Sequence, residues 1–585
     1  MNKPFQIALQ FIKIIGAELG IILLFLVVID NYIGETEEHI GFADGMGYFE
    51  YLPSTFIRHD INRKDFKLEE NPSVYANVQT VGVYNYYNDY TVNKYPCGTA
   101  ILQSPFFFYT YFTTKRDGTA HDGYQVSFQK TILFSTLFYL FLGLFFLKKI
   151  LLLYQINKAT IVFSQLLIVL ATPISHYAHI EASMSHVYSF FAISVFVYVT
   201  ILYFKEVKLK YFILMSLLLG LIFTIRQVNI LVVLSLPFLA GSFSSLKTGF
   251  LHVFQNPKWL LLGIVAFFSI VSVQLLFWHL QTGELIVYSY QNEGFNFFRP
   301  EFLNILFSYK KGLFLYTPVL FFSVIGVIYL FVQKKTWLAL TWLFFFIVIT
   351  YVFSSWHAWW YGGSFGSRPF IDFYALFFIT FALLLKEVKL FGKVIIIVVS
   401  VLFLFVNIIQ SYQYKEYILH SVTMDKEKYW TVFLKTEQRF NGLIWKEYID
   451  EAAFKVNGEV NIGDLSIEKD QNEVFLSFEA SKIPNFETVS IVQIELENDF
   501  KDENDSRILV SIDDSSSNYF WHERSVLHYY QESLNKWHLG KFNYKFTPVN
   551  SENKIVVTIL LSKANIDFEL KNVKIRFLSK KVSTN

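Results

Sequence analysis

Charged residues and cysteine are scarce in this sequence. Only 17% of the 585 residues are charged, whereas soluble proteins carry about 25%. Hydrophobic residues make up 53% of the chain and aromatic residues 19%. The single cysteine, Cys97, excludes an internal disulfide and a cysteine-based metal cluster. This composition argues against an ordinary soluble domain and predicts a polytopic membrane protein.

Nucleotide-binding motifs and a strong charge of one sign are also missing. No glycine-rich nucleotide fingerprint follows a predicted strand, and no predicted cytoplasmic segment is large enough to hold a nucleotide-binding domain. The formal net charge is only +2, which argues against a basic surface that follows nucleic-acid phosphates. We therefore expect no nucleic-acid partner.

Apolar runs long enough to cross roughly 30 Å of hydrocarbon recur through the first two-thirds of the chain. The first run is too long for a signal peptide and lacks a small-residue cleavage site, so we expect a retained helix. The two runs around Arg226 are short, and we expect them to tilt or to stop partway. The sequence predicts about eleven membrane helices, near residues 7–29, 131–151, 160–175, 186–204, 211–225, 228–245, 259–280, 315–333, 337–355, 372–390 and 393–411.

Lysines gather in every second connection between these runs. By the positive-inside rule such connections face the cytoplasm, and Lys3 agrees. An odd number of helices then places the C-terminal region outside. Lys310 and Lys311 fall on the predicted outer side and are the main exception, in a longer loop where the rule is weaker. The orienting lysines are Lys148, Lys149, Lys158, Lys205, Lys208, Lys210, Lys247, Lys258, Lys334, Lys335, Lys386, Lys389 and Lys393.

The segment from Trp356 to Arg368, WHAWWYGGSFGSR, directly follows a long apolar run. Tryptophan suits the membrane interface, where the ring is buried and its N–H stays wet. Glycine lets the backbone approach a ligand closely, and the Arg368 guanidinium presents planar donors that match a phosphate. An aromatic belt with a flexible turn would explain the tryptophans and glycines but not the arginine. The segment therefore predicts a lipid-phosphate site at the membrane surface.

Asp44, in the outer loop over residues 31–130, is the best candidate for a catalytic carboxylate. It precedes a run with one apolar helical face, which could lie flat on the membrane and hold the carboxylate near the interface. A carboxylate there can accept a proton from a hydroxyl. The alternative is that Asp44 only caps the helix that follows it. The residues on the apolar face are Tyr48, Tyr51, Leu52 and Phe56.

Polar and ionisable residues gather on the predicted outer side. Such groups near membrane depth are costly and usually functional. A carrier would place them near the midplane, in broken helices of two related halves, and the sequence shows no such internal repeat. Chemistry at one face is therefore favoured over transport. The residues are Asp44, Lys94, His176, His179, Glu181, His186, Arg226, His357 and Arg368.

The composition changes after about residue 412. Residues 412–450 read as an amphipathic linker, and period-two alternation with polar turns predicts an antiparallel β-sandwich over residues 451–585. Aromatic residues at 520–530 could stack on a sugar ring, although sandwich core is their commoner use. The predicted strands are NEVFLSFEA, TVSIVQIELEND, RILVSIDD, KIVVTILLS and FELKNVKIRFLS.

Together these elements resemble the GT-C superfamily of polytopic glycosyltransferases, including the protein O-mannosyltransferases and the lipid A aminoarabinose transferases. The resemblance rests on the retained first helix, the outer-loop motif DGMGYFEYLPS, the element NKYPCGTAILQSPFF at residues 93–107 and the Trp/Gly/Arg segment. It covers roughly residues 1–411 in architecture, and it implies that this region is the catalytic domain.

The resemblance implies roles for two carboxylates. Asp44 would be the general base, and Glu181 would match a second acidic residue that in some members helps to hold a divalent metal. The family usually pairs adjacent Asp and Glu on the first loop, whereas here Gly45 follows Asp44. A divalent metal is a possible cofactor, although histidines that bond to backbone are commoner. The histidines around Glu181 are His176, His179 and His186.

The resemblance also implies that cations neutralise the phosphate of a lipid-linked donor. Charge-assisted donors stabilise a leaving phosphate most where water is scarce. Solvation of Lys94 and snorkelling of Arg226 are the simpler alternatives. The expected substrate-binding residues are Lys94, Arg226, His357, Trp360 and Arg368.

The expected function is therefore transfer of a sugar from a polyprenyl-phosphate donor to a protein, lipid or glycan acceptor, with inversion at the sugar carbon. The expected location is a bacterial inner membrane, with the active site and the C-terminal domain on the periplasmic face, where nucleotide sugars are absent. Two alternatives remain open. One is a polytopic lipid or polysaccharide transporter, and the other is a non-catalytic component of an envelope assembly machine.

Overall fold

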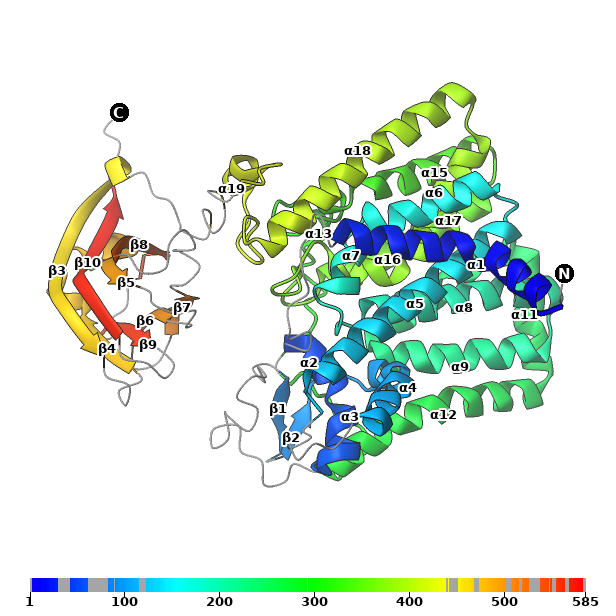
Figure 1. Ribbon diagram of the computed structural model, residues 1–585, viewed down its shortest axis with the longest axis horizontal. Helices are drawn as coiled ribbons and strands as arrows, with labels where there is room; N and C mark the ends of the chain where they lie inside the picture. The colour runs from blue at the N-terminus through cyan, green and yellow to red at the C-terminus, as the bar shows by residue number, and fades with distance from the viewer. Residues whose placement is uncertain are drawn as a thin grey trace. The chain divides into compact units, whose positions relative to one another are not determined.

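The computed structural model describes residues 3–29, 43–61, 83–88, 90–114, 123–291, 293–437, 440, 444, 451–467, 473–499, 507–514, 518–525, 537–546, 548–549, 554–562 and 568–581. The chain divides into two units. One contains Met1–Tyr412 and Ser421–Lys426, and the other contains Gln413–His420 and Glu427–Asn585. The first unit is mainly helical and the second is mainly built of β-strands (Figure 1).

The helical unit contains the following described elements. Its helices are α1 (Lys3–Val28), α2 (Ala43–Phe49), α3 (Tyr51–Pro53), α4 (Gly98–Thr113), α5 (Val126–Leu153), α6 (Lys158–Leu170), α7 (Ile174–His179), α8 (His186–Glu206), α9 (Leu209–Ile225), α10 (Leu236–Ala240), α11 (Phe243–Gln255), α12 (Pro257–Thr282), α13 (Phe302–Phe307), α14 (Leu313–Tyr316), α15 (Phe321–Val332), α16 (Thr336–Ser354), α17 (Tyr374–Glu387) and α18 (Leu390–Lys415). Shorter turns are η2 (Ser54–Arg58), η3 (Gln227–Ser235), η4 (Pro318–Leu320) and η5 (Arg368–Phe373), and the hairpin strands are β1 (Tyr84–Tyr87) and β2 (Tyr90–Asn93).

Every predicted apolar run coincides with helix in this unit. Among the described residues, six helices are long and apolar enough to cross a membrane: Val126–Leu153, His186–Glu206, Pro257–Thr282, Thr336–Ser354, Arg368–Glu387 and Leu390–Lys415. The remaining runs form shorter apolar helices. The predicted stop near Arg226 is confirmed, because α9 ends at Ile225, Arg226 is extended at φ −152° and ψ 118°, and the 3-10 helix η3 follows.

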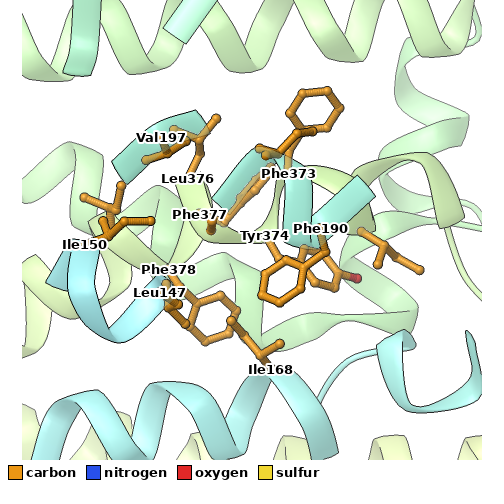
Figure 2. Packing of buried hydrophobic residues seen from close by; sticks show 14 of the residues in the cluster. Leu147, Ile150, Ile168, Phe190, Val197, Phe373, Tyr374, Leu376, Phe377 and Phe378 are labelled. Atoms are coloured by element: carbon orange, nitrogen blue, oxygen red, sulfur yellow. The ribbon is translucent and has the colours of Figure 1, made fainter. Parts of the chain in front are cut away.

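Helix α17 lies at the centre of the helical unit. Every residue from Tyr374 to Leu385 is buried, and the helix packs against α5, α6, α8 and α15. Figure 2 shows Phe377 and Phe378 of α17 among side chains from α5, α6 and α8, such as Leu147, Ile168 and Phe190. A helix that is apolar on all sides is buried by its neighbours. Because α17 is held in this way, the adjoining turn η5 and its residue Arg368 also have a fixed position.

The lysine-rich connections and the predicted outer connections lie at opposite ends of these helices. Helix α8 runs from His186 to Glu206 beside Lys205, and α9 returns from Lys208 towards Arg226. Helix α11 lies at the far end of the unit from α2, β1 and β2 (Figure 1). The structure therefore places the predicted functional residues at one end of the helices and most of the orienting lysines at the other.

Helix α2 and its continuation do not offer a free apolar face, contrary to the sequence expectation. Tyr48, Tyr51 and Leu52 are buried in the protein, and only Phe56 of the predicted face is exposed. The Tyr51 ring packs on Phe277 of α12, and its hydroxyl donates to the Tyr95 carbonyl at 2.6 Å. The face was read correctly as apolar, but it covers neighbouring helices rather than lipid.

The second unit contains two four-stranded sheets with strand orders β3-β10-β5-β8 and β4-β9-β6-β7. All their pairings are antiparallel. Both sheets contribute to one hydrophobic cluster, with alternate residues such as Val492, Ile494, Val510 and Ile575 pointing into it. The strands are β3 (Phe454–Ile467), β4 (Glu473–Glu479), β5 (Val489–Asp499), β6 (Arg507–Asp513), β7 (Asn518–Ser525), β8 (Trp537–Lys545), β9 (Val556–Ser562) and β10 (Phe568–Lys580), and helix α19 (Lys426–Val432) precedes them.

The five predicted strands correspond to β4, β5, β6, β9 and β10, whereas β3, β7 and β8 were not predicted. Strand β3 contains two glycines, and Gly463 has a positive φ of 81°, so its alternation is interrupted. Of the aromatic stretch expected to stack on a sugar, residues 526–530 lie outside the described residues.

Candidate functional site

A cavity of about 630 Å³ lies at the end of the helical unit that carries the predicted functional residues. It is lined by α2, the segment after β2, the start of α8, the junction of α9 and η3, the loop after α12, the segment after α16 and the start of η5. Its ionisable lining includes Asp44, Lys94, His186, Arg226, Glu293, His357 and Arg368, and its apolar lining includes Val228, Ile230, Leu231, Phe295, Phe297 and Val352. Five of the seven predicted site residues therefore meet in one cavity.

Asp44 forms an ion pair with Arg368 inside this cavity. The Arg368 guanidinium donates to Asp44 Oδ2 at 2.7 Å, and the Tyr95 hydroxyl donates to Oδ1 at 2.5 Å. Helix α2 begins at Ala43, so Asp44 lies in its first turn rather than at the N-cap, and side chains occupy both carboxylate oxygens. Burial raises the pKa of Asp44, but the Arg368 charge and the Tyr95 hydrogen bond outweigh burial and hold the pKa below its ordinary value.

The Tyr95 hydroxyl remains a donor to this carboxylate. Burial and the adjacent Asp44 charge raise the pKa of Tyr95 well above its ordinary value, so the hydroxyl stays protonated. The hydrogen bond and the Arg368 ion pair together fix one orientation of the carboxylate in the cavity wall.

Gly45 explains why a second acidic residue is missing beside Asp44. A Cβ placed on Gly45 would lie 1.8 Å from Ser183 Oγ. No larger residue fits there without displacing the connection between α7 and α8. The departure from the expected Asp–Glu pair therefore follows from the close packing of α2 on this connection.

A second guanidinium–carboxylate pair lies next to the first. Arg226 donates to Asp372 Oδ2 at 3.1 Å, and Asn229 donates to the same oxygen at 2.8 Å. The other oxygen, Asp372 Oδ1, lies 2.8 Å from His186 Nδ1. Asp372 is fully buried, so its charge acts on Arg226 and His186 with little screening. The break between α9 and η3 turns Arg226 into this cluster.

Lys94 provides the third pair. Its ammonium group is hydrogen-bonded to Glu293 from the loop after α12, and it lies 5.1 Å from the centre of the Tyr290 ring. Lys94 is therefore held in the cavity wall rather than left to solvent. The Ser289 hydroxyl donates to the Lys94 carbonyl at 2.7 Å and ties the two segments together.

The Trp356–Arg368 segment contributes His357 and Arg368 to the cavity and is held by two close backbone contacts. The His357 N–H donates to the Gly294 carbonyl at 2.9 Å, and Phe295 and Trp356 form an antiparallel bridge. Gly366 has a φ of 63°, and a Cβ there would lie 2.9 Å from Pro173 Cγ. The segment therefore needs glycine where it turns towards Arg368.

Two predicted site residues do not line the cavity. Glu181 is buried, lies 3.2 Å from His176 Nε2 and is not part of the cavity lining. Trp360 instead stacks with Lys310, whose ammonium group lies 3.5 Å from the centre of its ring. Each of the two residues contacts a basic side chain that also lies outside the cavity lining.

The histidines around Glu181 do not gather into a metal site. Among the described residues, no group of three or more His, Cys, Asp and Glu side chains could hold a metal ion. The physical reason is that His186 turns to Asp372 while His176 turns to Glu181. Residues 30–42 and 62–82 of the outer loop, which contain further carboxylates, lie outside the described residues.

Lys311, one of the two exceptions to the lysine pattern, is held inside the helical unit. It is buried and its ammonium group donates to the Ser364 carbonyl. Burial lowers the pKa of Lys311 well below its ordinary value, and the nearby Glu181 charge opposes this effect. A lysine enclosed in this way anchors the glycine-rich segment and gives no information on membrane orientation.

The sequence did not indicate the partners of the cavity cations. Asp372 is the third residue of an apolar-looking run after Pro369, and Glu293 lies in a polar loop. Each carboxylate pairs with a cation more than a hundred residues away, with sequence separations of 146 for Arg226 and Asp372 and 199 for Lys94 and Glu293. An isolated acidic residue at the edge of a membrane helix was the available signal, because such a residue needs a partner.

The cavity has the properties of a site for an anion with an apolar tail. Its three cations, Lys94, Arg226 and Arg368, each carry more N–H hydrogens than a contact with one carboxylate oxygen uses. A phosphate can share such donors, while a chain of apolar carbons can lie on the hydrophobic part of the wall.

Among solved structures, the chain is similar to the oligosaccharyltransferase of Archaeoglobus fulgidus in its apo form, with a TM-score of 0.40 and 11% identity over 72% of this chain and 60% of that chain. It is also similar to archaeal oligosaccharyltransferase AglB from Archaeoglobus fulgidus in complex with an inhibitory peptide and a dolichol-phosphate, with a TM-score of 0.39 and 11% identity over 72% of this chain and 60% of that chain.

A third similar structure is arabinosyltransferase EmbB from Mycobacterium smegmatis, with a TM-score of 0.39 and 8% identity over 97% of this chain and 64% of that chain. All three are named as sugar transferases, the class that the sequence resembles. No family model matches the sequence, and no curated protein matches it. The chain spans about 60% of the length of the oligosaccharyltransferase. These TM-scores are too low to support an inference about activity.

Proposed function

We propose that this protein is a membrane glycosyltransferase that moves a sugar from a polyprenyl-phosphate donor to a hydroxyl on the acceptor. The observation that carries the proposal is the pair of guanidinium–carboxylate contacts, Arg368 with Asp44 and Arg226 with Asp372, in a cavity at one end of apolar helices. This arrangement offers cations for a phosphate and a fixed carboxylate for a proton transfer in the same space.

The donor phosphate would bind to Arg226 and Arg368, with Lys94 as a third cation. Planar guanidinium groups suit phosphate oxygens better than a point charge does. The polyprenyl chain would leave along Ile230, Leu231 and Val352, which are apolar and line the same cavity. As the sugar–phosphate bond breaks, negative charge builds on the phosphate, and the cations stabilise that charge in a site with little water.

Asp44 would be the general base. The acceptor oxygen forms a bond to the anomeric carbon of the sugar, its proton passes to Asp44, and the phosphate departs with the electrons of the old bond. Attack on the side opposite to the phosphate inverts the configuration at that carbon. The contacts with Arg368 and Tyr95 keep Asp44 ionised at neutral pH, which leaves it able to accept the proton.

The membrane topology follows from the lysines. Eleven spans, counting the shorter apolar helices, would place the lysine-rich ends in the cytoplasm and the cavity on the periplasmic face of a bacterial inner membrane. The second unit would then also be periplasmic. Its two sheets would form a β-sandwich that contributes to the choice of a protein, lipid or glycan acceptor rather than to bond making.

The test is transfer by the purified protein in lipid nanodiscs, with polyprenyl-phosphate sugars as donors and release of polyprenyl phosphate as the readout. Accumulation of a lipid-linked sugar in a deletion strain, measured by mass spectrometry, would identify the natural donor. Movement of a lipid across the membrane with every sugar bond left intact would instead support a transporter.

A further inference from the structure

The charges around the cavity cancel before any ligand binds. Lys94 pairs with Glu293, Arg368 with Asp44, and Arg226 with Asp372. Three cations and three carboxylates therefore leave the described ionised groups of this cluster without net charge. An entering phosphodiester brings one negative charge that these pairs do not balance, and an uncompensated charge is costly where water is scarce.

His186 is the titratable side chain best placed to supply the compensating charge. Its Nδ1 lies 2.8 Å from Asp372 Oδ1 and 3.3 Å from an Arg226 nitrogen. A carboxylate that is paired with an arginine only accepts hydrogen bonds, so His186 Nδ1 must carry the proton that bonds to Asp372. The contact between His186 Nδ1 and the Arg226 nitrogen then joins two donors and is not a hydrogen bond. The neutral ring therefore has its lone pair on Nε2, which has no hydrogen-bond partner among the described residues.

The ring cannot turn to another partner. His186 is 2% exposed and lines the cavity. Its ring and the Tyr177 ring pack in an edge-to-face arrangement, with 4.9 Å between ring centres. The charged and titratable groups that face it are Asp372 and Arg368 from η5, Arg226 from the α9–η3 junction and Tyr177 from α7. A phosphate that enters the cavity adds a negative charge beside the ring, and a nearby negative charge favours the cationic form of an imidazole.

Resting on the proposed function, we propose that His186 takes up one proton when a lipid-linked phosphate enters the cavity and then donates from Nε2 to a phosphate oxygen. The proton comes from solvent and is bound by the Nε2 lone pair, the Nδ1 proton stays in the hydrogen bond to Asp372, and no bond of the lipid-linked sugar changes. Asp372 is the positioning residue, because it fixes the tautomer and stabilises the imidazolium. The phosphate would thus be held by two guanidinium groups and one imidazolium.

The proposal makes binding depend on pH with a defined sign. A phosphodiester has one charge throughout the neutral range, so its own ionisation adds nothing. Affinity should be greatest at low pH, where His186 is already protonated. It should weaken by up to about tenfold per pH unit where binding takes up one proton.

The experiment measures binding of the methyl ester of a polyprenyl phosphate, a phosphodiester without a sugar, to the full-length protein in nanodiscs. Calorimetry in two buffers with different ionisation enthalpies counts the protons taken up. We expect close to one proton in the wild type above the pH at which free His186 titrates, and none in His186→Asn. The asparagine amide can replace the Nδ1 donor to Asp372 but cannot take up a proton.

His279 gives the control, because it is exposed in the last turn of α12 and does not line the cavity. His279→Asn should keep the proton uptake. Asp372→Asn gives an independent variant, since it leaves one positive charge in the cavity. It should bind the probe without proton uptake and more tightly than the wild type at pH 8.5.

Several outcomes would overturn the inference. A wild type that binds the probe without proton uptake, or a folded His186→Asn protein with undiminished uptake, shows that His186 does not serve the phosphate, while the proposed function stands. Loss of uptake in a folded His279→Asn protein would show that the proton uptake does not arise in the cavity. A wild type that neither binds the probe nor transfers any sugar would refute the proposed function itself.

Discussion

Replacing Asp44 with asparagine is the sharpest test of the proposed chemistry. Asparagine keeps an oxygen that can accept from Tyr95 or Arg368, the two partners that the carboxylate has in the structure. The side chain has nearly the same size, so the cavity should keep its shape. What disappears is the ability to take a proton from the acceptor hydroxyl.

The expected loss is in the rate of transfer rather than in donor binding. Removing a general base slows a reaction by about 10²–10⁴, which corresponds to about 3–5 kcal/mol in the barrier. Asp44→Asn also leaves Arg368 without its counter-charge, so a phosphate donor should bind at least as tightly as before. A slower chemical step with unchanged or tighter donor binding separates a base from a residue that only orders the site.

The assay is single-turnover release of polyprenyl phosphate in nanodiscs, with donor affinity measured separately. Because Arg368 and Tyr95 hold the Asp44 pKa below its ordinary value, the acid limb of the wild-type rate should lie below the range in which an ordinary aspartate titrates, and Asp44→Asn should lack that limb. Glu387→Gln is the control, since it removes a carboxylate that pairs with Lys335 at the opposite end of the helices. Wild-type turnover by Asp44→Asn would refute the assignment.

Three further outcomes are expected. Arg226→Lys and Arg368→Lys should each weaken donor binding by about tenfold or more, because a two-pronged contact becomes a point contact; unchanged affinity in both would place the phosphate elsewhere. Gly366→Ala should lower the free energy of unfolding by about 1–3 kcal/mol, measured by thermal melting, because its φ is 63° and a proline ring is 2.9 Å from the new Cβ. In Lys482→Cys, a membrane-impermeant thiol reagent should label the exposed new cysteine from the periplasm. Background labelling should be low because Cys97 is fully buried. Protection of the new cysteine until the membrane is lysed would reverse the proposed topology.

The sequence was sufficient for the elements whose residues are all apolar or alternate strictly. The runs that became α5, α8, α12 and α18 were recognisable because a lipid environment demands about twenty apolar residues in each span. The break at Arg226 was also predicted, since an arginine between two short apolar runs interrupts both. Strand β3 was missed because its glycines weaken the alternation, and the spacing of its partner β10 in the chain gives no hint of the pairing.

For the candidate site, the sequence was sufficient to identify five side chains that line the same cavity. Asp44, Lys94, Arg226, His357 and Arg368 were identified from their residue types and places next to apolar runs, and they line one cavity. Only the tertiary structure decided their partners. Asp44 and Arg368 are 324 residues apart in the chain, and a pairing over that separation is set by helix packing rather than by a local pattern.

The structure also decided which candidates do not line the cavity. Glu181 turns to His176, Trp360 stacks with Lys310, and the unpredicted Asp372 holds both Arg226 and His186. The composition and the periodicity of apolar residues indicate where a chain enters and leaves the membrane, because both are properties of residues close together in the sequence. The ionisation and orientation of a buried side chain depend on charges a few ångströms away, and the folded arrangement of distant helices determines which charges those are.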